Sequence, residues 1–121
     1  MTLFRLGTSS IEQYEDSGIL ADLECGITAL SKANGILPES HPTKTDCLNN
    51  LGIAFFSQFE LLGDLADVDA AIMAQQLAVC LTPDGHVDKP TWLDNLGNSL
   101  QGHFEGRDDI IALNEAVAAR Q

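Results

Sequence analysis

The chain repeats itself every 45 residues, and this internal period constrains its fold more than any other feature. When the sequence is shifted by 45 positions, 15 of the 45 residues in 1–45 are identical to their matches in 46–90. Another 10 of the 31 residues in 46–76 are identical to their matches in 91–121, and no gap is needed. Unrelated segments would agree at roughly one position in fifteen. A period of this length indicates stacked supersecondary units, because each unit buries its apolar face against its neighbours.

The matched positions include apolar, glycine, aromatic, acidic, proline, histidine and lysine residues. Among them are Leu3/Leu48/Leu93, Gly7/Gly52/Gly97, Tyr14/Phe59/Phe104, Glu15/Glu60/Glu105, Pro38/Pro83, His41/His86 and Lys44/Lys89. We therefore divide the chain into a degenerate first unit at 1–45, a complete unit at 46–90 and a shortened unit at 91–121. In this register the chain starts inside a first helix and ends inside a second helix, as expected of a slice of a longer array.

The complete unit begins with a helical pattern of apolar residues. From Asp46 onwards these residues are spaced three or four apart, as on one face of a helix: Leu48, Leu51, Phe55, Phe59 and Leu62. Gly63 then interrupts the pattern. We expect a second helix from near Asp67, because Asp64, Asp67 and Asp69 can cap its start and suit its dipole.

The second helix also has an apolar stripe, and it ends at turn residues. The stripe is Leu65, Val68, Ile72 and Val79, with the small residues Ala71, Ala74 and Ala78 beside it. The segment from Thr82 to Gly85 contains Pro83 and an Asp-Gly pair, which favour a turn. Pro90 suits the first turn of the next helix. Each unit is therefore predicted to be helix, turn, helix and linker, which makes the chain all-α with six helices, the outer two incomplete.

The complete unit at 46–90 resembles the tetratricopeptide repeat (TPR) family. Its consensus slots for Leu-Gly, an aromatic residue, two small residues and a proline are filled by Leu51, Gly52, Phe55, Ala71, Ala78 and Pro83. Extending the usual unit of about 34 residues to 45 takes a seven-residue extension between the helices and a four-residue longer linker. Gln75 departs from the aromatic of the second helix, and Ser10 replaces the aromatic of the first unit.

The segment at 47–60 is similar to the long-loop repeats of kinesin light chains and to tandem TPR arrays common in fungal proteins, some of which carry a caspase-like CHAT domain. The resemblance implies a right-handed α-solenoid of helix-turn-helix repeats with a period of 45. It also implies that any catalytic pair of a parent CHAT protein would lie outside this chain.

Charge and composition exclude several classes of function. The net charge of −12 comes from 18 acidic and 6 basic residues, which argues against nucleic acid and against an anionic membrane surface. No apolar run approaches the ~20 residues that span a bilayer, and no signal peptide is recognisable. Cys25, Cys47 and Cys80 fall in three different slots of the repeat, which favours reduced thiols and a cytoplasmic location over a disulfide framework.

Three groups of residues suggest chemistry, and each has a simpler explanation in the repeat. His41 and His86 occupy the same slot of successive units, where neighbours would lie about 10 Å apart, too far for ligands about 2.1 Å from one zinc ion. The run from Asp64 to Asp69 lacks the glycine and glutamate of a calcium loop. Cys80 has no base placed beside it. His103 has no histidine at the matched position of another unit. We therefore expect no catalytic residue, metal or cofactor.

Four asparagines are the candidate binding residues. The resemblance to kinesin light chains nominates Asn49, Asn50, Asn95 and Asn98 as contacts for an extended peptide, because an amide can bond both peptide N–H and C=O groups. The alternative is that Asn50 and Asn95 only bond neighbouring helices and stabilise the stack.

The sequence thus predicts a protein-interaction scaffold that is not an enzyme and that binds an extended or helical peptide along its concave face. Because the first helices of the second and third units carry no Lys or Arg among these positions, the partner is expected to be a basic or neutral protein or peptide. Two alternatives are the regulatory or sensor arm of a larger enzyme, such as a CHAT peptidase or signalling ATPase, and self-association through the open ends.

Overall fold

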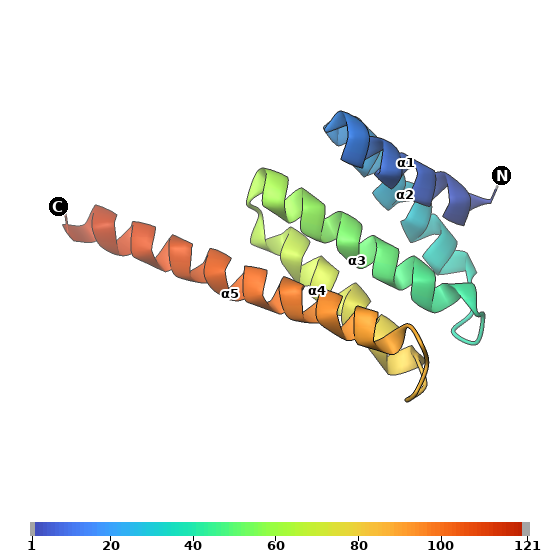
Figure 1. The fold of residues 1–121 in the computed structure, drawn as a ribbon. Helices are drawn as coiled ribbons and strands as arrows, with labels where there is room; N and C mark the ends of the chain where they lie inside the picture. The colour runs from blue at the N-terminus through green and yellow to red at the C-terminus, as the bar shows by residue number, and fades with distance from the viewer. Residues whose placement is uncertain (1, 120–121) are drawn as a thin grey trace.

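The computed structural model describes residues 2–119, with side-chain surroundings for residues 2–106, and this part of the chain is all-helical (Figure 1). In order along the chain the helices are α1 (Leu3–Ser17), α2 (Leu20–Ile36), α3 (Thr43–Leu62), α4 (Leu65–Leu81) and α5 (Lys89–Ala119). Helices α1 and α2 form one antiparallel pair, and α3 and α4 form another. Helix α5 packs on α4, so that α1, α3 and α5 lie in one layer with α2 and α4 behind them.

The turn inside each pair is made by a glycine at matched positions. Gly18 has φ 70° and Gly63 has φ 73°, and their N–H groups donate to the carbonyls of Tyr14 and Phe59, both at 2.7 Å. Glycine suits this left-handed end of a helix because it has no Cβ. Asp64 then caps α4 by accepting a 2.9 Å bond from the Ala66 N–H.

The predicted boundaries need two corrections. Helix α3 begins at Thr43, before the expected Asp46, and α4 begins at Leu65, before the expected Asp67. Only Gly63 and Asp64 separate the two helices, so the additional residues of the unit lengthen its helices and do not form the long loop that the resemblance implied. Regular helix satisfies the backbone hydrogen bonds of these residues and lets them pack on the paired helix, which an extended loop would not.

The prediction of a sixth helix is wrong, because α5 runs unbroken from Lys89 to Ala119. The position that matches Gly18 and Gly63 is Asp108. A residue with a Cβ pays a steric cost in the left-handed conformation that ends α1 and α3, and here the helix continues through it. The predicted end of α4 is confirmed, with Leu81 its last residue, and Pro90 lies in the first turn of α5 as expected.

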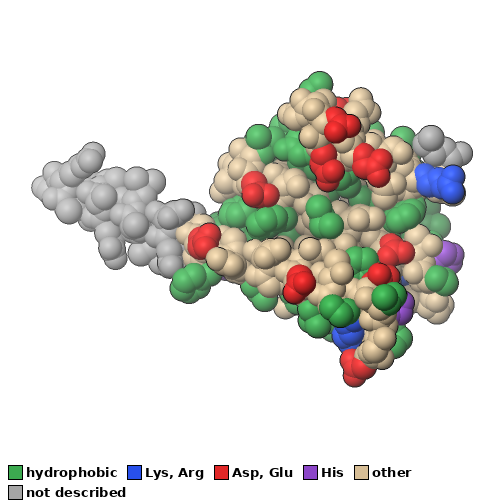
Figure 2. Space-filling model, viewed as in Figure 1, with side chains coloured by type: hydrophobic (Ala, Val, Ile, Leu, Met, Phe, Trp, Pro, Cys, Tyr) green, Lys and Arg blue, Asp and Glu red, His purple; other side chains and the backbone are tan. Residues whose placement is uncertain are grey.

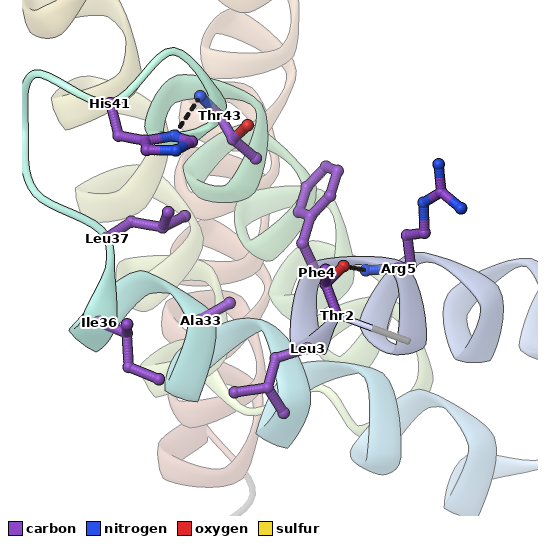
Figure 3. A pocket seen from close by; sticks show the side chains of 9 residues that line it. All are labelled: Thr2, Leu3, Phe4, Arg5, Ala33, Ile36, Leu37, His41 and Thr43. Atoms are coloured by element: carbon purple, nitrogen blue, oxygen red, sulfur yellow. Dashed lines mark hydrogen bonds between the residues drawn. The ribbon is translucent and has the colours of Figure 1, made fainter.

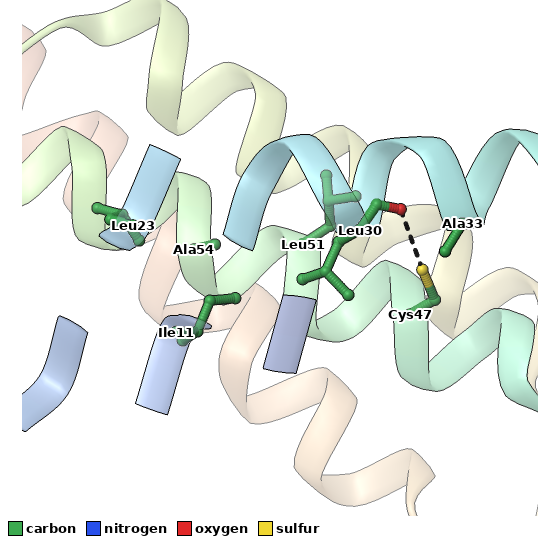
Figure 4. Close-up of a cluster of buried hydrophobic side chains, with 7 residues drawn as sticks. All are labelled: Ile11, Leu23, Leu30, Ala33, Cys47, Leu51 and Ala54. Atoms are coloured by element: carbon green, nitrogen blue, oxygen red, sulfur yellow. Dashed lines mark hydrogen bonds between the residues drawn. The ribbon is translucent and has the colours of Figure 1, made fainter. Parts of the chain in front are cut away.

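The hydrophobic core lies where α2 is held between α1 and α3 (Figure 4). Its buried side chains are Ile11, Leu23, Leu30, Ala33, Cys47, Leu51 and Ala54. A Cβ added to Gly7 would lie only 2.6 Å from Cγ of Leu30, so α1 and α2 approach closely at this glycine. On the other side the Cys47 thiol donates to the Leu30 carbonyl at 3.3 Å. Leu30 therefore joins its own pair to the next one. Of the helices that the structure describes, none is both long and apolar enough to cross a bilayer.

Candidate functional site

A groove between the first helices α1 and α3 is the strongest candidate for a binding site. It encloses about 270 Å³ and is lined by Thr8, Ile11, Glu12, Glu15, Asn50 and Ile53. The half-buried Asn50 amide can donate and accept at once, and the two isoleucines provide an apolar floor. This combination suits a polypeptide main chain with intermittent apolar side chains.

The other three nominated asparagines lie further along the same layer. Asn49 is buried, and its Oδ1 accepts a 3.0 Å bond from Nδ2 of Asn95, which joins α3 to α5. Asn95 is half-buried and Asn98 is exposed. The structure therefore places Asn50 on the α1–α3 groove and uses Asn49 and Asn95 to hold two first helices together.

The layer of first helices carries a row of acidic side chains. Glu15, Glu60 and Glu105 occupy matched positions and are all exposed. Figure 2 shows this face, with acidic side chains spread across it and the visible Lys and Arg side chains at its margins. Because neither Lys nor Arg lines the α1–α3 groove, the electrostatic potential there favours a cationic or neutral ligand over an anionic one.

The linkers between helix pairs are closed by the matched histidines. Nδ1 of His41 accepts from the Thr43 N–H at 3.0 Å, and Nδ1 of His86 accepts from the Asp88 N–H at 3.1 Å. Each histidine thus serves its own linker, as the repeat predicts. On the neighbouring α3, the pKa of Asp46 is raised by burial and by the charge of Asp88, an effect that His86 opposes.

The matched lysines tie each linker to the end of the preceding helix. Nζ of Lys44 donates to the carbonyls of Asn34 and Leu37 at 2.5 and 3.0 Å, and Lys44 is buried. Nζ of Lys89 donates to the Thr82 carbonyl at 3.0 Å and to Oδ1 of Asp84 at 2.7 Å. An ammonium group suits the negative end of a helix dipole. The hydrogen bond from Lys89 also lowers the pKa of the exposed Asp84.

The acidic run at the start of α4 has three separate partners. Asp64 caps the helix, Asp67 accepts a 2.9 Å bond from Gln58, and Asp69 lies 3.1 Å from Nε2 of His103 on α5. Helix capping therefore explains Asp64, as predicted. In the part of the chain that the structure describes, no three His, Cys, Asp or Glu side chains are grouped to hold a metal ion.

A second hollow lies at the N-terminal end of the molecule, where α1 approaches the end of α2 and the start of α3. It encloses about 420 Å³ and is lined mainly by apolar side chains (Figure 3): Thr2, Leu3, Phe4, Arg5, Ala33, Ile36, Leu37, His41 and Thr43. Two of its polar groups are already occupied, since Oγ1 of Thr2 accepts from the Arg5 N–H at 3.2 Å and Nδ1 of His41 accepts from the Thr43 N–H. This hollow offers apolar volume and no acid–base pair.

The three thiols differ in their surroundings. Cys25 and Cys80 are exposed, whereas Cys47 is buried. Burial raises the pKa of the Cys47 thiol, and the nearby Lys44 only partly offsets this effect. Cys25 accepts from the Ser10 hydroxyl at 3.6 Å and Cys47 donates to a carbonyl, and neither partner can act as a general base.

Comparison of the chain with protein-family models, with curated proteins and with solved structures finds no match in any of the three. The geometry of the groove is therefore what indicates its role.

Two features of the structure were not predicted from the sequence. The bond between Asn49 and Asn95 spans 46 residues, one more than the period, so matching equivalent positions does not pair them. The other is the N-terminal hollow. The sequence signal that could have indicated it is the presence of Phe4 and Arg5 where the next unit has Asn49 and Asn50.

Proposed function

We propose that this chain is a TPR-like solenoid with a period of 45 residues that serves as a protein-interaction scaffold. In this proposal an extended or helical peptide lies along the layer of α1, α3 and α5. The observation that carries the proposal is the α1–α3 groove, where the Asn50 amide, an apolar floor and two carboxylates meet in about 270 Å³. The matched glycine turns and linker bonds support a repeated architecture.

The chemistry of the groove defines the partner. Asn50 can bond both a peptide N–H and a peptide C=O, which holds main chain without regard to side chains. Glu12 and Glu15 attract Lys or Arg, and Ile11 and Ile53 accept an apolar side chain. The partner is therefore a basic or neutral segment, and Asn98 is a further contact because it matches Ile53 in the next unit.

We propose binding in place of catalysis and a location in the cytoplasm. The hydrogen bonds of Cys25 and Cys47 to groups that are not bases support the first point. The free state of all three cysteines supports the second, because oxidising compartments favour disulfides.

The test uses three fluorescent peptides of equal length that alternate small residues with Lys, Ser or Glu. Anisotropy titrations should rank the Lys peptide tightest, the Ser peptide next and the Glu peptide weakest. Asn50→Ala should weaken the binding of the first two peptides about five- to thirtyfold, because one to two hydrogen bonds of roughly 1 kcal/mol each are lost. Gln76→Ala, which removes an exposed amide on α4, is the matched control and should change nothing. Unchanged affinity in a fully folded Asn50→Ala variant would show that the groove is not the site.

A further inference from the structure

Helix α5 carries an apolar stripe that the rest of the described chain leaves largely uncovered. The α5 stripe consists of Leu93, Gly97, Leu100 and Phe104, which point within an arc of about 60° at about 100° per residue. Its three large side chains are 48%, 47% and 66% exposed in chain order. The residue matched to Leu93 in α3 is Leu48, which is only 3% exposed, and the residues matched to Leu100 and Phe104 are half-buried. The same positions are thus covered in α3 and open in α5.

The glycine in the middle of the stripe shows what kind of element fits there. A Cβ added to Gly7 or Gly52 would collide with Leu30 of α2 or Gln75 of α4. A Cβ added to Gly97, the third matched glycine, would meet nothing within 4 Å. In α1 and α3 the covering element is an antiparallel helix that places one long side chain on the glycine. The α5 stripe therefore fits another helix, with a side chain of the size of leucine on Gly97.

The side of α5 that packs on the body of the molecule is a different one. A Cβ at Gly102 would lie 2.7 Å from the Phe56 ring, and one at Gly106 would lie 3.0 Å from Phe59 and 3.2 Å from Leu65. These two glycines point about 150–170° away from the centre of the α5 stripe. Helix α5 is also the last helix of its layer (Figure 1). A partner can therefore reach the stripe without displacing any helix that the structure describes.

The charges beside the α5 stripe indicate the chemistry of its partner. Asp94 and Glu105 are both exposed and lie on the same flank, about 90–110° from the centre of the stripe. Gln101 is exposed between them, and the segment 93–106 contains no Lys or Arg. This flank attracts Lys or Arg side chains. A second copy of the chain, with its net charge of −12, would instead bring like charge to it.

We propose that the α5 stripe is a docking surface for an amphipathic helix of a basic partner protein. The partner helix lies antiparallel to α5, as α2 lies on α1 and α4 on α3. Its apolar face covers the stripe with a leucine on Gly97, and Lys or Arg along one side of it meet Asp94 and Glu105. This surface is separate from the α1–α3 groove, so each can be tested without the other.

The test uses the full chain and three labelled peptides of about 16 residues, which is long enough to run beside the α5 stripe at about 1.5 Å per residue. The first has leucines at helical spacing, alanines elsewhere and lysines along one side. The second has glutamates in place of the lysines, and the third is a scramble of the first. Anisotropy titrations should show at least about tenfold weaker binding of the second and third peptides, and far-UV circular dichroism should show that the first gains helix on binding. Equally tight binding of either control peptide would overturn the proposal.

Variants of α5 locate the site. Gly97→Leu should weaken binding of the lysine peptide about tenfold or more, because the docked leucine then meets a side chain of its own size. This variant should fold normally, since a Cβ there has space and leucine favours helix more than glycine. Thr91→Leu is the matched control, because Thr91 is exposed and points about 150° away from the stripe, and it should change nothing. The double change Asp94→Asn and Glu105→Gln should weaken the lysine peptide about three- to tenfold. Unchanged affinity in folded Gly97→Leu, or in the double variant, would contradict docking of a basic helix on α5.

Two further measurements separate this proposal from other occupants and from the α1–α3 groove. By sedimentation equilibrium the wild type should be monomeric at the concentrations of the titration. A wild-type dimer that Gly97→Leu dissociates would show that a second copy covers the stripe and would overturn the proposal. Asn50→Ala, which tests the groove, should leave binding of the lysine peptide unchanged. Loss of that binding in a folded Asn50→Ala variant would place the helix in the groove and would contradict docking on α5.

Discussion

Gln75 interrupts an otherwise apolar position and offers the sharpest test of how the helix pairs pack. It is 2% exposed, and its Oε1 has no hydrogen-bond partner. Its match in the first pair is Leu30, which is fully buried and packs against Gly7 as Gln75 packs against Gly52. The change Gln75→Leu therefore places in α4 the residue that α2 already uses at the same contact.

The expected effect is a gain in the free energy of unfolding. A buried polar atom without a partner costs about 1–3 kcal/mol. Leucine has nearly the same volume as glutamine, and exchanges that conserve volume cost less than about 1.5 kcal/mol when the site must adjust. The balance predicts that Gln75→Leu stabilises the protein by about 1 kcal/mol, which corresponds to a rise in Tm of roughly 4 °C for a chain of this size.

Urea unfolding followed by far-UV circular dichroism measures this difference, with a constant m-value showing that only stability changed. Gln76→Leu is the matched control, because Gln76 is the exposed neighbour on the same helix and its change should stay within about 0.5 kcal/mol. A loss of 1 kcal/mol or more in Gln75→Leu would refute the reasoning. It would mean that the amide is paired in solution.

Two further predictions concern the linkers between helix pairs. Lys44→Met should lower the free energy of unfolding by about 2 kcal/mol, because it keeps the buried stem but removes two charge-assisted bonds to carbonyls at the end of α2. Thermal melts of Lys32→Met, which changes an exposed lysine of α2, should show no comparable loss of stability. Equal losses in the two variants would contradict the capping role of Lys44. Asp46→Asn should stabilise the protein at pH 7. The pKa of Asp46 is raised in the folded state. The protonated carboxyl therefore contributes fully to the free energy of unfolding below the usual pKa, and this contribution is lost as pH rises through the pKa of the folded state. The gain from Asp46→Asn should therefore shrink as pH falls through the range just above about 4, and urea unfolding at several pH values that shows a constant or growing gain would argue against burial of this carboxyl.

Several elements could be predicted from the sequence because their signals are local. Helix α3 shows apolar residues at a helical spacing, and Gly63 followed by Asp64 marks a turn with a capping residue. The role of His86 within its own linker follows from its match with His41. Each of these inferences depends on residues close together in the chain, whose geometry the backbone preferences largely determine.

The candidate site was harder to predict from neighbouring residues. Asn50 was nominated and lies on the α1–α3 groove, but Asn49 was nominated with it and is buried against Asn95. Adjacent residues on a helix point about 100° apart, so which of the two faces a neighbouring helix depends on how the pairs stack. That stacking is set by close contacts such as Leu30 against Gly7, which involve residues far apart in sequence.

The sequence by itself determined that the chain is helical and where the helices of the complete unit turn, because apolar spacing, glycine, proline and capping residues act through the backbone next to them. The tertiary structure decided the rest. The residues expected in a loop extension belong to longer helices, and Lys89–Ala119 is one continuous helix. The surface of α5 around Gly97 has no helix of the described part of the chain packed on it. The physical reason is that a repeat specifies equivalent surfaces, whereas the cover of each surface depends on which helix can reach it. At position 108, which matches the glycines that end α1 and α3, α5 continues as helix, so no turn there brings a second helix back.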